Sequence, residues 1–237
     1  MTSPRPLVWF RSDLRVRDNT ALFNACRRAD GRSGAGVVAV FVVSPGEWKA
    51  HDYAPVRVDL LLRSLSELSA TLAELGIPLI IETAPDADRI PTLLTKLAKK
   101  HQCAEIHFNK EHEINESRRD EAVIAAFQRA GLEAFAHTDQ VCFEPGTIRT
   151  GEGRFFTIYS PFKRACFKQW ESVGGVPPLE APSAQAPVEV ASSPVPKAIT
   201  GWKSTVPIER WPAGESAAHK RLKSFATQSI VPYKDRR

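Results

Sequence analysis

The chain has 237 residues, of which 43% are hydrophobic and 25% charged, and its formal net charge is +5. This composition is typical of a globular protein and leaves room for one large or two small domains. It excludes collagen-like and disulfide-scaffold proteins, and no apolar run reaches the roughly 18 residues that a membrane span needs.

The cysteines are spaced too widely for a CxxC zinc or redox motif, since they stand at Cys26, Cys103, Cys142 and Cys166. The first ten residues, MTSPRPLVWF, lack the apolar stretch of a signal peptide. We therefore expect a cytoplasmic, monomeric protein with reduced thiols, no membrane partner and no metal site.

Strand and helix signals alternate five times between residues 6 and 137. Short apolar runs rich in β-branched residues predict strands at residues 7–10, 36–43, 77–81, 104–108 and 132–137. Helices are predicted between them, at residues 19–29, 55–76, 87–101 and 115–130. This alternation predicts a doubly wound α/β domain over residues 1–140, with a five-stranded parallel sheet covered by helices on both faces.

Capping residues support the helix boundaries. Asp18 and Asn19 are suitable N-caps for the first helix, and Asn115 is one for the last. Pro55 suits the first position of the long helix, and Gly76 suits its C-terminal end.

The second half of the chain has a different composition. A short helix is predicted at residues 162–170, and eight prolines follow between Gly174 and Pro212. We interpret residues 141–212 as an interdomain helix and a connector that runs extended across the first domain.

A helical pattern resumes at Gly214. One helix cannot bury its own apolar face, so residues 213–237 are expected to be the first helix of an incomplete all-helical domain, and the chain to be the front part of a longer protein. The segment from Lys197 to Arg237 has nine basic and three acidic residues, which is compatible with a polyanionic partner.

Ligands of an open parallel sheet bind beyond the carboxyl ends of its strands. Two of the predicted loops at that edge are rich in groups that hold ligands. The loop at residues 44–53 contains Trp48, His51 and Tyr53, and the loop at residues 109–116 contains Asn115 and Glu116. The alternative stays open that Asn115 is only an N-cap and Glu116 only a first-turn carboxylate.

Other candidate sites are weaker. The charged loop at residues 11–19 is interpreted as a salt-bridged loop with a helix cap. The glycines at residues 31–36 precede a strand instead of following one, so they do not form a phosphate loop. No catalytic Ser/His/Asp or Cys/His set can be assembled, and His107 and His112 do not have the spacing of a convincing metal site.

Five motifs, in order, resemble the DNA photolyase and cryptochrome family. They are LVWFRSDLRVRDNTAL (7–22), EWKAHDYAP (47–55), FNKEHEINESRRD (108–120), FFTIYSPFKRACFKQW (155–170) and WPAGESAAHKRLKSFATQSIVPYKDRR (211–237). Because they span most of the chain, they are more specific than any single pattern.

The resemblance implies an α/β antenna domain, a connector and an all-helical FAD domain. In this family, light-excited reduced flavin donates an electron to a cyclobutane pyrimidine dimer in DNA, which then splits. The family's antenna pigment passes excitation energy to the flavin without reacting, so no catalytic side chain is expected here. The resemblance assigns His51, Asn115 and Glu116 to binding of a 5,10-methenyltetrahydrofolate antenna, Tyr233 to FAD and Arg237 to DNA.

The resemblance also implies that most of the flavin and lesion sites lie beyond Arg237. We therefore expect a deoxyribodipyrimidine photolyase whose first 237 residues alone bind no FAD and repair no DNA. A cryptochrome-type photoreceptor and a stand-alone pigment-binding module are the alternatives.

Overall fold

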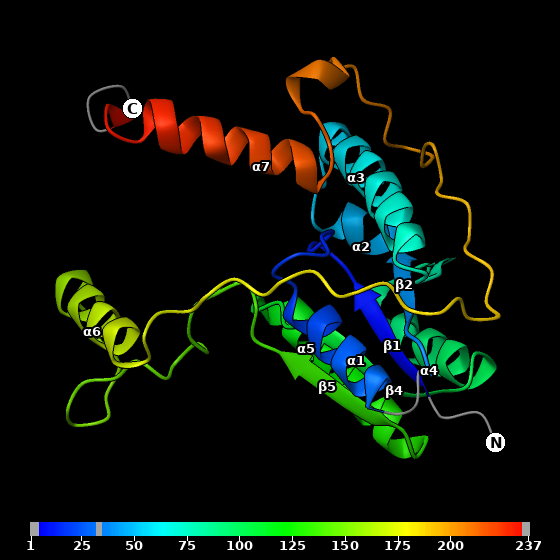
Figure 1. Cartoon of the computed structure of the whole chain (residues 1–237), viewed down its shortest axis with the longest axis horizontal. Coiled ribbons are helices and arrows are strands. Elements are labelled where there is room, and N and C mark those ends of the chain that lie inside the picture. The colour runs from blue at the N-terminus through cyan, green and yellow to red at the C-terminus, as the bar shows by residue number, and fades with distance from the viewer. Residues whose placement is uncertain (1–4, 32–34, 234–237) are drawn as a thin grey trace.

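The computed structural model describes residues 5–31 and 35–233 (Figure 1). Five parallel strands form one sheet in the order β3-β2-β1-β4-β5. The strands are β1 (Arg5–Phe10), β2 (Val38–Val43), β3 (Leu79–Thr83), β4 (Cys103–Asn109) and β5 (Glu133–His137). The doubly wound parallel sheet predicted from the sequence is confirmed.

Two helices cover each face of the sheet. Helices α1 (Thr20–Asp30) and α3 (Pro55–Glu74) pack on one face, where Phe10 and Phe41 are buried. Helices α4 (Ile90–Lys100) and α5 (Ile114–Arg129) pack on the other face over Trp9 and Phe108. Burial on both faces explains why β2 reads as the continuous apolar run VAVFVV.

Two of the predicted helix starts are confirmed, and two short helices were not predicted. Asn19 caps α1, because its side chain accepts a hydrogen bond from the backbone N–H of Leu22 at 3.0 Å. Pro55 is the first residue of α3, as predicted. Two short helices were not predicted, α2 (Pro45–Ala50) and the 3-10 turn η1 (Ala87–Arg89), which precedes α4.

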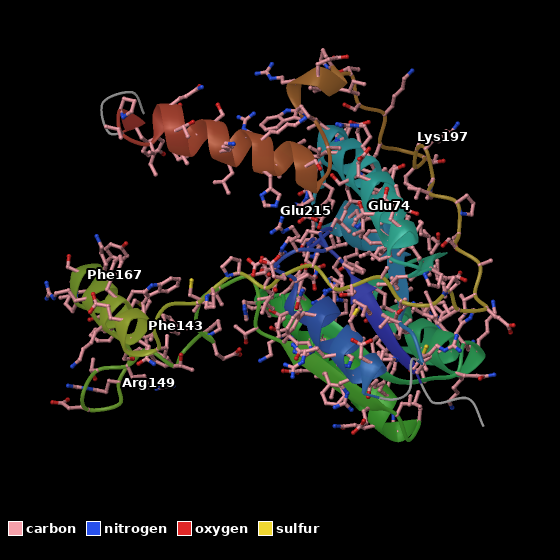
Figure 2. All side chains as sticks on the ribbon, viewed as in Figure 1. Glu74, Phe143, Arg149, Phe167, Lys197 and Glu215 are labelled. Atoms are coloured by element: carbon pink, nitrogen blue, oxygen red, sulfur yellow. The ribbon has the colours of Figure 1, made fainter. Side chains whose placement is uncertain are left out.

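Residues 141–175 leave the sheet and form an excursion that contains α6 (Tyr159–Ser172) (Figure 1). Figure 2 shows Phe143, Arg149 and Phe167 together on this excursion, away from the sheet. Aromatic side chains of this segment surround an apolar cavity of about 580 Å³. Helix α6 is longer at both ends than the predicted helix, and none of its residues, all of which are described, is buried.

The Pro-rich connector runs extended along the α/β unit, as predicted. The backbone N–H of Gln185 donates to the carbonyl oxygen of Leu75 at 2.9 Å. Farther on, the N–H of Ser193 donates to the carbonyl oxygen of Leu79 at 2.8 Å, which covers the edge of β3. The connector thereby satisfies part of a strand edge that would otherwise expose unpaired backbone groups.

One glycine permits the connector to lie this close. Gly76 has a φ of +71°, and a Cβ atom at this position would lie 2.5 Å from the carbonyl oxygen of Gln185. Side chains are therefore excluded here by both conformation and space.

After the connector come the 3-10 turn η2 (Ile208–Arg210), helix α7 (Glu215–Ser224) and the π-helical segment η3 (Phe225–Ser229). Within residues 5–31 and 35–233, no helix is long and apolar enough to cross a membrane.

Candidate functional site

A cavity of about 1460 Å³ lies at the carboxyl ends of the strands. The loop after β1 lines it, together with Trp9 and Arg119. Trp48 and Tyr53 line one side with the middle of α3, the first turn of α5 lines another, and residues 211–222 line the wall that includes α7. The cavity is therefore where parallel sheets bind their ligands.

The loop after β1 is held by a buried polar network. The side chain of Asn109, at the end of β4, donates to Asp13 Oδ2 at 2.6 Å and to Asn19 Oδ1 at 3.0 Å. Its own Oδ1 accepts from the backbone N–H of Ala21 at 2.9 Å. Arg11 donates to Asp120 and to the carbonyl oxygen of Asn109. The interpretation of residues 11–19 as a salt-bridged loop with a helix cap is confirmed.

Arg119 holds two carboxylates of the cavity in place. Its Nη1 lies 2.6 Å from Glu47 Oε1, and its Nη2 lies 2.6 Å from Glu111 Oε2. Burial alone would lower the pKa of Arg119, but Glu47 and Glu111 raise it above its usual value. Burial alone would raise the pKa of Glu111, but the Arg11 cation and the Ser12 hydroxyl lower it. Arg119 and Glu111 therefore both stay charged at neutral pH.

Asp120 behaves differently from Glu111. Burial raises its pKa above the usual value despite the nearby cations of Arg11 and Arg119. Its Oδ2 atom is buried and has no hydrogen-bond partner among the described residues.

An aromatic group stands beside this network. The rings of Trp48 and Tyr53 are stacked, with centroids 6.1 Å apart and 4° between their planes. Trp202 of the connector packs edge-on against Trp48, and its Nε1 donates to the carbonyl oxygen of Tyr53 at 2.8 Å. The connector thus fixes the aromatic side of the cavity.

The structure brings His51 and Glu116 together. His51 Nδ1 lies 3.6 Å from Glu116 Oε1, and its ring packs edge-on against Tyr53. His51 is the C-cap of α2, and Glu116 lies in the first turn of α5. The two loops selected from the sequence therefore meet at the carboxyl ends of the strands.

Asn115 is not the N-cap of α5, so that prediction was wrong. Helix α5 begins at Ile114, and Glu113 has the extended N-cap conformation with φ −67° and ψ 153°. Asn115 is thus inside the first turn, where its backbone is helical and its side chain is exposed.

Tyr233 follows α7 and η3 and is not among the residues that line the cavity. Its side chain is 55% exposed and packs edge-on against Phe225, with ring centroids 5.8 Å apart. Arg237 lies outside the described residues.

Three polar atoms around the cavity are buried and have no hydrogen-bond partner within the described part of the chain. They are Trp9 Nε1, Glu116 Oε2 and Arg119 Nε, and all three residues line the cavity. Buried polar groups in folded proteins are nearly always paired, so these atoms are available to a ligand or to water in the cavity. Two donors and one carboxylate acceptor suit a planar heterocycle with both donor and acceptor atoms.

The framework residues Arg119 and Asp120 were not singled out from the sequence, nor was the wall formed by α7. A pattern that could have indicated them is the run SRRD at residues 117–120, because it places Arg119 and Asp120 three and four residues after Glu116 in a helix. Among the described residues, no group of three or more His, Cys, Asp or Glu side chains is arranged to hold a metal ion.

Comparison with known proteins gives consistent results. A sequence profile described as DNA photolyase matches residues 6–183. The deoxyribodipyrimidine photo-lyase of Salmonella typhimurium is 31% identical over 235 residues, which cover 99% of this chain and 48% of that protein. The chain thus spans about half the length of this curated relative.

Two solved structures have a similar fold over 99% of this chain. A class III photolyase from Agrobacterium tumefaciens has a TM-score of 0.76 at 24% identity, and 47% of its chain is covered. A cryptochrome from Synechocystis has a TM-score of 0.74 at 20% identity, and 49% of its chain is covered.

Proposed function

The chain belongs to the DNA photolyase family, and from this premise we propose that it is the light-harvesting part of a deoxyribodipyrimidine photolyase. In this role it binds an antenna pigment whose excitation serves the flavin-dependent splitting of pyrimidine dimers in DNA. The observation that carries the proposal is the cavity lined by Trp9, Glu116 and Arg119, each of which has a buried polar atom without a partner among the described residues. His51 contacts Glu116 beside this cavity.

The pigment that we propose is 5,10-methenyltetrahydrofolate. Its pterin ring carries an amino group and ring nitrogens, and Glu116 Oε2 is a buried acceptor without a partner among the described residues. His51 and Asn115 are proposed as the other contacts. The bound pigment would absorb near-UV and blue light and transfer excitation energy.

The residues of this chain would bind and orient the pigment and exclude water from it. Trp48 and Tyr53 offer flat apolar surface, and Arg119 keeps the carboxylates of Glu47 and Glu111 fixed. The cavity volume of about 1460 Å³ exceeds the 300–1,000 Å³ of ordinary small-molecule sites, which leaves room for a pigment with a tail.

The same proposal includes FAD and DNA. Tyr233 is the proposed FAD contact, but its side chain is exposed. Arg237 is the proposed DNA contact. Unpaired cysteines at all four positions support the proposed cytoplasmic location, because reduced thiols persist there.

The test is a titration of the purified 237-residue protein with 5,10-methenyltetrahydrofolate, followed by absorbance and fluorescence. We expect saturable binding at one site per chain, weakened in Glu116→Gln. A wild-type protein that binds no folate would contradict the proposed pigment. Photorepair of a thymine-dimer oligonucleotide by the full-length gene product tests the lyase assignment, and its absence would favour a cryptochrome-type photoreceptor.

A further inference from the structure

One wall of the cavity is made by α7, a helix that is attached only weakly to the rest of the protein. All ten of its residues are described, and none of them is buried. Its apolar side chains give it little hold on the α/β unit, since Leu222, for example, is 63% exposed. Something other than hydrophobic packing must therefore fix this wall.

Glu215 makes that attachment. Its Oε2 accepts a hydrogen bond from the backbone N–H of Val16 at 2.9 Å, and its Oε1 accepts one from Arg17 N–H at 3.2 Å. Figure 2 shows Glu215 at the start of α7, where the helix comes closest to the loop after β1. A carboxylate that accepts two N–H donors forms charge-assisted hydrogen bonds, which are stronger than neutral ones.

The position of Glu215 is fixed from two sides. Glu215 is the first residue of α7, where a negative charge is favoured by the helix dipole. The preceding residue, Gly214, has a φ of +86°, and a Cβ atom there would lie 2.8 Å from the side chain of Glu67 on α3. The chain therefore turns tightly over α3 directly before the carboxylate.

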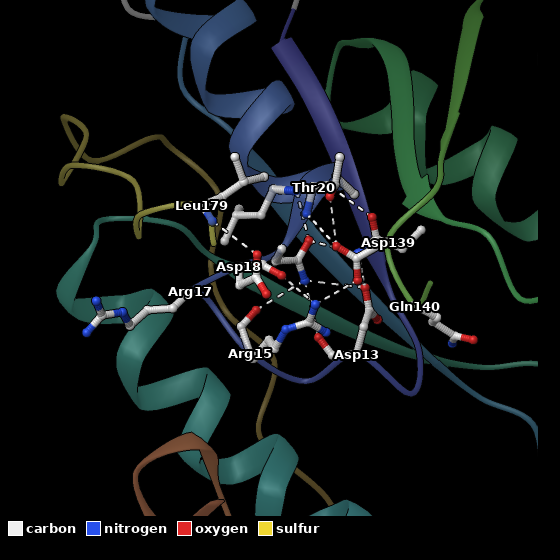
Figure 3. A network of polar contacts seen from close by, with 12 residues as sticks. Asp13, Arg15, Arg17, Asp18, Thr20, Asp139, Gln140 and Leu179 are labelled. Atoms are coloured by element: carbon white, nitrogen blue, oxygen red, sulfur yellow. Dashed lines mark hydrogen bonds and ion pairs between the residues drawn. The ribbon is translucent and has the colours of Figure 1, made fainter. Parts of the chain in front are cut away.

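The loop that receives Glu215 is braced independently. Arg15 Nη2 lies 2.7 Å from Asp139 Oδ2, and the N–H of Thr20 donates to Asp139 Oδ1 at 2.9 Å. Asp18 exchanges two hydrogen bonds with Leu179 of the connector, at 2.8 and 3.0 Å. Figure 3 shows these contacts around the loop. Because the loop is already fixed, the bonds to Glu215 position α7 and not the reverse.

We infer that Glu215 is a positioning residue for the pigment site: it holds α7 against the loop after β1 and so sets the width and the water content of the cavity. The inference rests on the proposed function, since it concerns the same cavity. Ser12, Asp13, Leu14 and Arg15 line the cavity on one side of this contact, and residues 216–222 line it on the other. Loss of the contact would let α7 move away and admit water to the pigment.

The experiment compares the wild-type protein with Glu215→Ala, Glu215→Gln and the control Glu209→Ala, a substitution of an exposed residue in the same segment. Amide hydrogen exchange of Val16 and Arg17, measured without pigment, reports the contact itself. We expect exchange to rise in Glu215→Ala, to rise less in Glu215→Gln because one acceptor oxygen remains, and to be unchanged in the control.

The same variants are then saturated with 5,10-methenyltetrahydrofolate. In Glu215→Ala we expect the dissociation constant to rise about tenfold, as for loss of a hydrogen bond to a charged group. We also expect the absorption maximum of the bound pigment to move toward its value in water, which a general loss of stability would not cause at saturation. Wild-type affinity and spectrum in Glu215→Ala would overturn the inference. Absence of folate binding by the wild-type protein would instead overturn the proposed function.

Discussion

The Nδ1 atom of His107 lies 3.0 Å from the Nε2 atom of His137, and the two rings are stacked with 12° between their planes. On its other side, His107 Nε2 lies 3.3 Å from Glu105 Oε1, and Arg28 of α1 donates to both oxygens of Glu105. Because a carboxylate only accepts, His107 donates from Nε2 to Glu105. Arg28, Glu105, His107 and His137 thus form a polar row that joins α1, β4 and β5.

This row titrates in two separate pH ranges. Burial, followed by the charge of His107, lowers the pKa of His137 to about 4. Burial alone would raise the pKa of Glu105, but hydrogen bonds from His107 and Arg28 lower it to about 2. Neutral His137 makes its full contribution to the free energy of unfolding above pH 6.5, the pKa of histidine in the unfolded chain. This contribution is lost as the pH falls toward 4. Stability from Glu105 is lost only below pH 4.5.

The first prediction concerns His137→Phe, which keeps a stacked ring and removes the titrating nitrogen. The pKa shift of His137 would correspond to about 3 kcal/mol at full burial, and solvent access to the half-buried ring reduces this to about 1–2 kcal/mol. Between pH 6.5 and 4.5, the free energy of unfolding of the wild-type protein should fall by this amount more than that of the variant. Urea denaturation at several pH values measures it.

Gln128→Phe is the control for this series, because Gln128 is an exposed residue on α5 without a titrating group. It should retain the pH dependence of the wild-type protein. Parallel curves for His137→Phe and the wild-type protein would show that His137 does not titrate in this way.

The second prediction concerns the contact between Gly76 and the connector. Gly76 and Gly131 have nearly the same φ, +71° and +72°, but only at Gly76 would a Cβ atom meet another residue within 4 Å, namely Gln185. Gly131→Ala should therefore cost about 1–2 kcal/mol of stability from the left-handed backbone alone. Gly76→Ala should cost at least about 1 kcal/mol more, since the connector must also shift.

Thermal and urea denaturation of the two glycine variants measures this difference. Equal destabilisation would mean that the connector is not held against this end of α3. Faster proteolysis within residues 184–202 in Gly76→Ala, but not in Gly131→Ala, would locate the change.

Much of the sheet could be predicted because its signals are local. The β-branched run of β2, the cap at Asn19 and the proline at the start of α3 each act within a few residues. Helix α2 was not predicted, because six residues, PGEWKA, are too short to show a helical period. The N-cap of α5 was predicted at Asn115, because Asn is a more common capping residue than Glu. In the structure the N-cap is Glu113, whose backbone is extended.

The site could be predicted only in part. His51 and Glu116 were selected because parallel strands bring their following loops to one edge. The contact between Glu215 and Val16 joins residues 199 positions apart in the sequence, and nothing local indicates it. The polar residues of β4 do have a local signal, since Glu105, His107 and Asn109 alternate with apolar residues and so share one face.

The third prediction concerns the acceptor in the pigment site. Glu116→Gln keeps the shape of the side chain but removes its charge, and one oxygen becomes an NH₂ donor. We expect the dissociation constant for 5,10-methenyltetrahydrofolate to rise about tenfold. Glu121→Gln, an exposed position on the same helix, should bind like the wild-type protein. Equal weakening by both variants would mean that general loss of negative charge, and not a contact with Glu116, is responsible.

The fourth prediction separates light harvesting from repair. Tyr233 is 55% exposed and the nearby Val231 is 89% exposed, whereas a tightly bound flavin needs a largely enclosed site. After incubation with excess FAD and removal of free flavin, the 237-residue polypeptide should retain well under one flavin per chain, on the order of 0.1. It should also leave a thymine-dimer oligonucleotide unrepaired under blue light. Folate binding in the same preparation is the control for correct folding. A stoichiometric flavin spectrum would show that this polypeptide completes an FAD site by itself, whereas folate absorbance without flavin would show that the pigment cavity forms independently of it.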